Sequence, residues 1–274
     1  MTFLIRPAEL AHLLAGPTPP VVLDVQFALG GPASGELYAA GHLTGAPHLP
    51  LEGALAGPPG LGGRHPLPDP RRLEAELRRC GVDDDSVIVV YDQQTSLAAA
   101  RAWWILRWAG LGNVRVLDGG LAAWVGHRGP VSTQSVTPRP GTVSIRPGSL
   151  PHLDTDEAAA WAAAGRLLDV RTRERYLGET EPIDPVAGHI PGARNLPIGD
   201  LMRADGTFAD PATIATAARA HGVAPGIPIG TSCGSGVTAA QAALALAEAG
   251  FEAVPYIGSW SAWITDPSRP VARG

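Results

Sequence analysis

One cysteine in this sequence stands in a setting that favours thiolate chemistry. Cys233 opens the run Cys-Gly-Ser-Gly-Val-Thr over 233–238, in which two glycines and a serine let the backbone curl tightly. We expect this loop to lie between a strand and a helix, so that backbone N–H groups point inward and form an anion-binding nest. Such a setting lowers the pKa of a thiol, and the nest would also hold a terminal persulfide sulfur. Attack on a sulfur donor, followed by release to a second nucleophile, is covalent catalysis in two steps.

Alternating strands and helices are expected to position this loop. The stretch 227–232 reads as a strand that leads into Cys233, and 238–249 reads as an apolar helix ended by glycine. In the first half of the chain, 87–91 and 98–109 form the same pair of elements. This alternation predicts an α/β fold with a mainly parallel sheet and helices on both faces. Ligands bind such folds at the carboxyl ends of the strands.

The sequence repeats itself over a distance typical of one domain. Three segments recur roughly 140 residues later: 23–25 as 168–170, 40–50 as 187–197, and 119–124 as 258–263. The spacing predicts two similar domains, with the first at 1–130 and the second, catalytic one at 151–274. The intervening 131–150 is rich in Pro, Ser, Thr and Gly and is predicted to be an interdomain linker.

The first copy of the repeat has Asp92 where the second copy has Cys233. A carboxylate cannot carry transferable sulfur, so the first domain is expected to be catalytically silent. We interpret Asp92 either as the relic of a loop or as a partner for its own backbone amides.

Other residues with reactive side chains are predicted to be structural. Cys80 ends an amphipathic helix and is followed by the stop signal Gly81. His42 and His189 occupy equivalent places in the two copies although only one copy has the cysteine. A role common to both copies favours structure over catalysis.

Composition excludes several function classes. The 274 residues carry a net charge of −5 without lysine or a basic block, so nucleic acid is not an expected partner. No apolar run is long enough to span a membrane, and the N-terminus does not resemble a secretory signal. Two distant cysteines indicate a cytoplasmic protein rather than a disulfide scaffold. Neither cysteine has a second ligand at metal-binding spacing, so no metal or cofactor is expected.

The chain as a whole resembles the tandem-domain rhodanese family. The resemblance rests on the duplication, on Gly-His-Ile-Pro-Gly-Ala at 188–193, on the loop 233–238 and on Gly-Ser-Trp at 258–260. It implies two rhodanese-like domains and a sulfurtransferase that carries sulfur as a persulfide on Cys233. The donor would be a small anion, and the acceptor a thiol, such as thioredoxin or a low-molecular-weight thiol, or cyanide.

The loop composition bears on the donor. Thiosulfate sulfurtransferases tend to have Arg or Lys inside the loop, whereas Gly234 and Ser235 resemble the 3-mercaptopyruvate sulfurtransferases. The resemblance also implies a proton relay from Ser235 to a histidine and an acid, for which His65 and Glu52 are the candidates. The remaining loop residues are expected to bind substrate: Gly234, Gly236, Val237 and Thr238.

A substrate anion requires a cation, and the resemblance places it at Arg175. A planar guanidinium binds such an anion through two hydrogen bonds. Asp184 stands where mercaptopyruvate enzymes usually have a second arginine. The loop favours mercaptopyruvate and the missing second arginine does not. We favour mercaptopyruvate as the donor and keep thiosulfate as the alternative.

Two readings from other classes are possible for the same loop. A cysteine phosphatase or arsenate reductase would need an arginine at the end of the loop, where this chain has Thr238 or Ala239. A non-catalytic module could instead accept sulfur on Cys233 for a partner protein. Turnover with small acceptors distinguishes the enzyme from the carrier.

Overall fold

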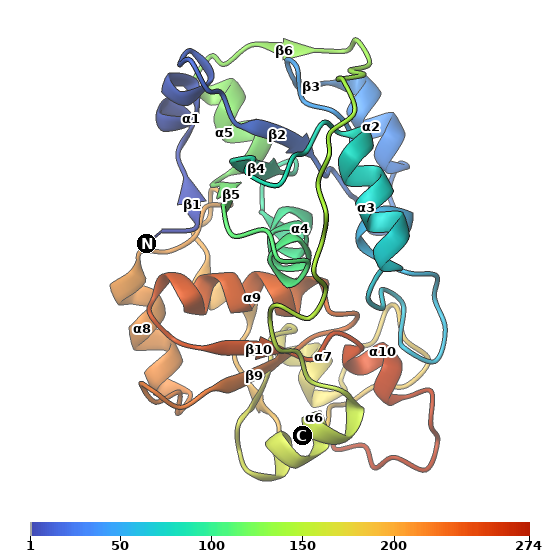
Figure 1. Ribbon diagram of the computed structural model, residues 1–274. Helices are drawn as coiled ribbons and strands as arrows, with labels where there is room; N and C mark the ends of the chain where they lie inside the picture. Colours follow the sequence, from blue (N-terminus) through green and yellow to red (C-terminus); the bar gives the residue numbers. More distant parts are fainter. Residues whose placement is uncertain (1) are drawn as a thin grey trace. The chain divides into compact units, whose positions relative to one another are not determined.

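The computed structural model describes residues 2–274, which fold into two compact units (Figure 1). Unit 1 comprises Met1–Gly57, Leu67–Leu150 and Ala204–Thr207. Unit 2 comprises Pro58–Pro66, Pro151–Arg203 and Phe208–Gly274. Each unit therefore contains a short segment taken from within the other's stretch of the chain.

Unit 1 is built around a parallel sheet with strand order β1-β5-β4-β2. These strands are β1 (Leu4–Ile5), β2 (Val21–Asp24), β4 (Ile88–Tyr91) and β5 (Val114–Leu117). All four residues of β4 are buried, as expected for a central strand covered on both faces. A separate antiparallel pair joins β3 (His42–Leu43) to β6 (Val131–Ser132).

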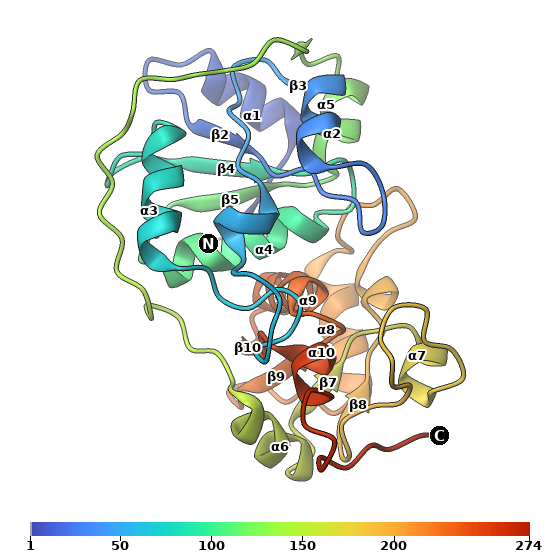
Figure 2. The same cartoon turned by 90° about the vertical axis from the view of Figure 1, so that its right-hand side faces the viewer.

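Helices cover both faces of the sheet in unit 1. Leu10 of α1 (Pro7–Leu14) and Trp124 of α5 (Gly120–Gly126) share one apolar cluster with sheet residues. On the other face, α4 (Leu97–Trp108) packs against β4 and β5 (Figure 2). The remaining elements of unit 1 are α2 (Ser34–Ala40), η1 (Leu51–Leu55) and α3 (Pro70–Arg79).

Unit 2 repeats the plan with a parallel sheet of order β10-β9-β7-β8. The strands are β7 (Leu167–Asp169), β8 (Arg194–Asn195), β9 (Ile229–Ser232) and β10 (Ala253–Pro255). One face is covered by α6 (Thr155–Ala163) and α10 (Ser259–Trp263), and the other by α9 (Val237–Glu248), against which α8 (Pro211–Ala220) packs. The shorter elements are α7 (Arg173–Leu177) and η2 (Ile198–Leu201). The predicted α/β fold with two similar domains is confirmed.

The carboxyl ends of the unit 2 strands bring the predicted site together. Strand β9 ends at Ser232, directly before Cys233, and its neighbour β7 ends at Asp169, shortly before the arginines of α7. Because parallel strands end at the same edge, residues far apart in sequence meet there.

The segment 58–66 joins this edge from a distant part of the chain. Gly63 lies so close to α10 that an added Cβ would lie 2.7 Å from the carbonyl oxygen of Gly258. Its φ of +97° also lies in the region that favours glycine. The backbone N–H of the next residue, Arg64, donates to Ser261 Oγ at 3.0 Å. Glycine at position 63 therefore allows the segment to pack against the start of α10.

Candidate active site

Backbone amides surround the sulfur of Cys233. The N–H groups of Ser235 and Gly236 lie 3.4 and 3.1 Å from Sγ and point toward it. Gly236 is the residue before α9 and has a φ of +81°, and an added Cβ there would lie 2.1 Å from the carbonyl oxygen of Ile257. Only glycine fits this position, and its conformation turns the amides inward. Gly234, by contrast, does not have a positive φ. The predicted nest is therefore present, with one left-handed glycine.

The sulfur is recessed within the loop. Cys233 is only 2% exposed, and most of the loop is buried, whereas Ser235 and Thr238 are partly exposed. The side chain of Cys233 therefore lies inside the loop and not at its surface. A recessed sulfur favours a donor that presents a slim terminal atom.

The start of α10 holds the loop in place. The backbone N–H of Trp260 donates to the carbonyl of Cys233, and the backbone N–H of Ser261 donates to the carbonyl of Gly234. Ser259 Oγ accepts from Cys233 N–H at 3.1 Å and lies 3.8 Å from Sγ. Ser259 has a φ of +51°, which is strained for a residue with a side chain. These contacts give the Gly-Ser-Trp motif at 258–260 a structural role, although the contact of Ser259 with the sulfur was not predicted.

His65 contacts the loop on its exposed side. Its Nδ1 lies 2.9 Å from Ser235 Oγ, so the two groups share a hydrogen bond. His65 is buried, which fixes the ring against the hydroxyl. Glu52 is exposed and lies in unit 1, so its part in the relay stays a prediction.

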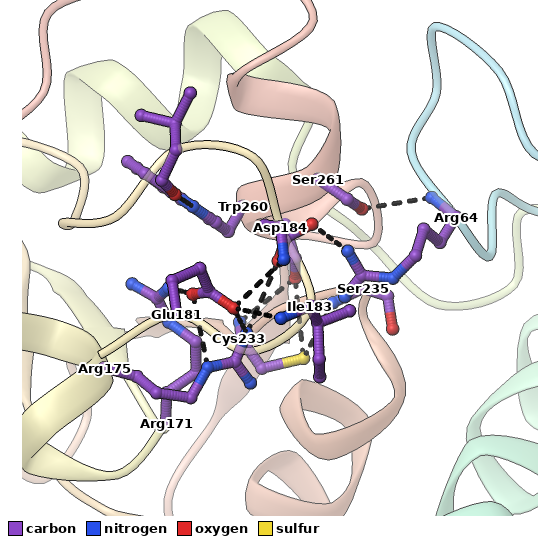
Figure 3. A network of polar contacts seen from close by, with 12 residues as sticks. Arg64, Arg171, Arg175, Glu181, Ile183, Asp184, Cys233, Ser235, Trp260 and Ser261 are labelled. Carbon is purple, nitrogen blue, oxygen red and sulfur yellow. Dashed lines mark hydrogen bonds and ion pairs between the residues drawn. The ribbon is translucent and has the colours of Figure 1, made fainter. Parts of the chain in front are cut away.

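Arginines and carboxylates form a network beside the loop (Figure 3). Arg171 is buried and its Nη2 lies 2.6 Å from Asp169, while its Nη1 lies 3.4 Å from Glu181. Its guanidinium also lies over the ring of Trp260, 5.0 Å from the centroid. Arg171 is thus held by other protein groups, as expected for an ion-paired residue.

Arg175 lies next in the network. Its Nη2 and Nε contact Glu181 at 2.6 and 3.2 Å, and Nη2 lies 3.4 Å from Asp184. Burial would raise the pKa of Glu181, but the hydrogen bond from Arg175 and the backbone N–H groups of Asp184 and Ile183 outweigh it and lower that pKa. Glu181 is therefore a firmly ionised anchor for Arg175.

Asp184 connects Arg175 to Arg64. Its carboxylate forms an ion pair with Arg64 Nη1 and a longer contact with Arg175. Burial raises the pKa of Asp184 above its ordinary value despite the attraction of Arg64. Arg64, Glu181 and Ser259 were all missed as site residues in the sequence. The Gly-rich stretch around Arg64 was the only local signal for that residue.

The guanidinium groups of Arg64 and Arg175 both lie beside the backbone of Gly234. A Cβ placed on Gly234 would lie 2.9 Å from Arg64 Nη2 and 3.5 Å from Arg175 Nη2. Glycine at this position thus leaves room for two cations immediately next to the cysteine.

The equivalent loop of unit 1 holds a carboxyl group where unit 2 has the cysteine sulfur. Asp92 is buried, and its Oδ1 accepts from the N–H groups of Gln94 and Ser96 at 3.2 and 3.0 Å. Its Oδ2 accepts from Ala98 and Ala99 at the start of α4, at 2.9 and 3.2 Å. Burial raises the pKa of Asp92, and these four amides oppose that rise. The interpretation of Asp92 as a partner of its own amides is confirmed.

The residues predicted to be structural have structural contacts. His42 and His189 are buried, stack on Tyr38 and Tyr176 with centroids 3.8 Å apart in both cases, and place Nδ1 on the carbonyl of the same tyrosine. Cys80 is buried and its sulfur lies 3.7 Å from the carbonyl of His48. Within residues 2–274 no cluster of three metal-ligating side chains occurs, and no helix is long and apolar enough to cross a membrane.

Comparisons with known proteins identify the family. The model of the rhodanese-like domain matches residues 6–127 and again residues 154–266. The chain is 44% identical to "Putative thiosulfate sulfurtransferase SseB" of Mycobacterium tuberculosis, over 99% of this chain and 97% of that protein. It is 43% identical to "Probable 3-mercaptopyruvate sulfurtransferase" of Pseudomonas aeruginosa, over 99% and 98%. The solved structure of the 3-mercaptopyruvate sulfurtransferase SseA from Escherichia coli superposes with a TM-score of 0.82 at 29% identity, covering 95% of this chain and all of that one.

The chain therefore belongs to the rhodanese family, in which it is a tandem-domain member. It is an enzyme of the sulfurtransferase class. The relatives carry two donor names at nearly equal identity, so the donor has to be argued from the site.

The two cysteines are expected to differ in reactivity. Burial raises the pKa of Cys80 to about 11, whereas amide N–H groups stabilise an anion at Cys233. With iodoacetamide near neutral pH, peptide mapping should show alkylation at Cys233 and not at Cys80. Cys80 should gain reactivity only as the pH approaches 11, because its thiolate is scarce below that value. Preferential alkylation of Cys80 at neutral pH would contradict this assignment.

Proposed function

We propose that the protein transfers sulfur from 3-mercaptopyruvate to a thiol or cyanide through a persulfide on Cys233. The observation that carries this proposal is the pair of N–H groups aimed at Cys233 Sγ from the start of α9. Amides in this arrangement stabilise a thiolate and, after transfer, a terminal persulfide anion.

The first step transfers one sulfur atom. The Cys233 thiolate attacks the sulfur of mercaptopyruvate, a new S–S bond forms, and the C–S bond of the donor breaks. The electron pair of that bond leaves with carbon as the enolate of pyruvate. The enolate takes up a proton at carbon, and the enzyme is left with Cys233 as a persulfide. The amides of Ser235 and Gly236 stabilise the anion on either sulfur, so they stabilise both the thiolate before the transfer and the persulfide after it.

Ser235 and His65 are proposed to supply the proton for the enolate. Their 2.9 Å contact places an ionisable ring behind a hydroxyl that is partly exposed beside Cys233. A hydroxyl backed by histidine can donate a proton and be reprotonated, which is general acid catalysis. Thiosulfate requires no such proton, because sulfite leaves directly with the electron pair of the broken S–S bond.

Ser235→Ala is therefore expected to act on one donor only. We expect kcat with mercaptopyruvate to fall by about 10²-fold, the usual contribution of a general acid. The rate with thiosulfate should change by less than about threefold, since the amide nest is made by backbone and is retained. Steady-state rates with both donors test this, with His65→Gln as a second variant of the same relay. An equal loss with the two donors would contradict the proton-relay role.

The second step returns the enzyme to its starting state. A thiolate acceptor attacks the outer sulfur of the persulfide, forms an S–S bond with it, and displaces the Cys233 thiolate. With cyanide the same displacement gives thiocyanate. We propose thioredoxin or a low-molecular-weight thiol as the cellular acceptor. We also propose the cytoplasm as the compartment, and the two unpaired cysteines support this choice.

Arg175 is proposed to bind the carboxylate of the donor. Its guanidinium lies beside Gly234, next to the cysteine, and Glu181 fixes its orientation. Gly236, Val237 and Thr238 complete the substrate-binding loop in this proposal. The first domain, 1–130, is proposed to be catalytically silent, since Asp92 occupies its nest.

The donor is tested by paired rate measurements. We expect kcat/KM for mercaptopyruvate to exceed that for thiosulfate, because the Ser235–His65 pair serves only a carbon leaving group. A preference for thiosulfate of more than about tenfold, or roughly 1.4 kcal/mol in barrier, would reverse the assignment of donor and leave sulfur transfer intact. Single turnover without repeated turnover on small acceptors would favour the alternative of a sulfur-carrier module.

A further inference from the structure

The carboxylate of Asp184 contacts two guanidinium groups at once. Its Oδ1 forms the ion pair with Arg64 Nη1, and its Oδ2 lies 3.4 Å from Arg175 Nη2 (Figure 3). The side chain of Asp184 is only 3% exposed, so solvent screens these contacts little. One buried carboxylate therefore lies against both of the cations that border Gly234.

The backbone of Asp184 is held in place independently of its carboxylate. Glu181 Oε1 accepts from the backbone N–H groups of Ile183 and Asp184 at 3.2 and 3.1 Å. The same oxygen lies 2.6 Å from Arg175 Nη2, so Glu181 ties this turn to α7. Loss of the charge at Asp184 would thus leave the turn and its attachment to Arg175 intact.

The formal charge of the ion-pair network is zero, because it contains three arginines and three carboxylates. Its members are Arg64, Arg171, Arg175, Asp169, Glu181 and Asp184. Asp169 and Glu181 both contact the buried Arg171, whereas Asp184 contacts only the two arginines beside Gly234. Asp184 therefore decides whether the region next to the cysteine loop carries an excess of positive charge.

A bound anion responds to this balance in proportion to its own charge. Coulomb energy scales with the product of the interacting charges, so the Asp184 carboxylate repels a dianion twice as strongly as a monoanion at the same place. Mercaptopyruvate carries a single negative charge on its carboxylate, whereas thiosulfate is a dianion. The same carboxylate thus disfavours the two donors unequally.

We propose that Asp184 is a specificity-determining residue, whose carboxylate limits the positive charge beside Gly234 and so selects monoanionic sulfur donors over dianionic ones. The substrate class is a small donor with a single carboxylate close to its transferable sulfur. This inference rests on the proposed function and names the side chain that discriminates between the two donors.

The test removes the charge of Asp184 and keeps its shape. In Asp184→Asn the side-chain carbonyl oxygen can still accept from Arg64, so the change is mainly electrostatic. The matched control is Glu179→Gln, which removes an exposed carboxylate from the same loop.

The first readout needs no turnover. Methanesulfonate and sulfate are similar in size and shape but carry one and two negative charges, and each is titrated for protection of Cys233 from iodoacetamide. In Asp184→Asn we expect the half-protecting concentration to fall about threefold for methanesulfonate and about tenfold for sulfate, the latter equivalent to about 1.4 kcal/mol. Glu179→Gln should leave both concentrations unchanged.

The second readout is kcat/KM with each donor, measured with the full chain and 2-mercaptoethanol as a neutral acceptor. In Asp184→Asn we expect a rise of about threefold with mercaptopyruvate and about tenfold with thiosulfate, for the same electrostatic reason. Glu179→Gln should again match the wild-type enzyme.

Two results would overturn the proposal. Equal changes for the monoanion and the dianion would show that Asp184 only positions Arg64 and Arg175. Wild-type values in Asp184→Asn would show that the donor does not sense a charge at this position. A failure of the proposed function is distinguishable, since the wild-type enzyme would then form no persulfide on Cys233, while the ratio of the two half-protecting concentrations would still report the charge of Asp184.

Discussion

Replacing Cys233 with serine is expected to abolish sulfur transfer, lowering kcat with any donor by about 10⁴-fold or more. Serine is close to isosteric, so the amides of Ser235 and Gly236 would still surround the side chain. A hydroxyl cannot form a persulfide, and no other group in the described loop carries a sulfur atom. The loss should therefore be chemical and should not reflect unfolding.

The matched control is Cys80→Ser, because Cys80 is the only other cysteine in the chain. Its sulfur is buried in unit 1 against the carbonyl of His48 and contributes nothing to the proposed chemistry. Steady-state rates with mercaptopyruvate and with thiosulfate should be unchanged in this variant. Full activity in Cys233→Ser, or loss in Cys80→Ser alone, would refute the assignment of the nucleophile.

Replacing Asp92 with alanine is expected to lower the free energy of unfolding by about 3 kcal/mol, the largest loss of stability among the proposed variants. Four backbone N–H groups, those of Gln94, Ser96, Ala98 and Ala99, would lose their buried acceptor. Each buried donor left unsatisfied costs roughly 1–3 kcal/mol, less whatever relaxation recovers. The urea midpoint of unfolding, followed by circular dichroism, measures the effect.

The matched control for this prediction is Asp92→Asn. Its carbonyl oxygen can still accept from two of the four amides, while its NH₂ group faces the others, so we expect an intermediate loss.

Burial raises the pKa of Asp92, so its ionisation costs more in the folded chain than in the unfolded chain. The stability that this group contributes is therefore greatest at acidic pH and falls as the pH rises through its folded pKa. An unchanged midpoint in Asp92→Ala would contradict the description of a carboxylate-filled nest.

The local patterns in the sequence predicted the fold and the centre of the site well. The helix expected at 238–249 is Val237–Glu248, and the strand expected at 227–232 is Ile229–Ser232. The Gly-Ser-Gly spacing predicted the amides around Cys233, and the repeat predicted the self-bound carboxylate of Asp92. These features depend on neighbours within a few residues, which is why the sequence reveals them.

Features that depend on distant contacts were not predictable. Arg64 reaches the loop only because Gly63 lies against α10, almost two hundred residues further along the chain. Likewise, Ser259 with its strained backbone makes a contact with a distant part of the chain, in which its Oγ accepts from the backbone N–H of Cys233 at 3.1 Å. Of the two glycines that were expected to let the loop curl tightly, only Gly236 has a positive φ. Long-range packing, and not local propensity, decides each of these.

The most direct measurement is the mass of the Cys233 peptide after the enzyme meets mercaptopyruvate in the absence of an acceptor. We predict a gain of one sulfur atom on that peptide, its loss when cyanide is added, and no gain on the Cys80 peptide. A sulfur found on Cys80, or pyruvate released while the Cys233 peptide stays unmodified, would contradict it.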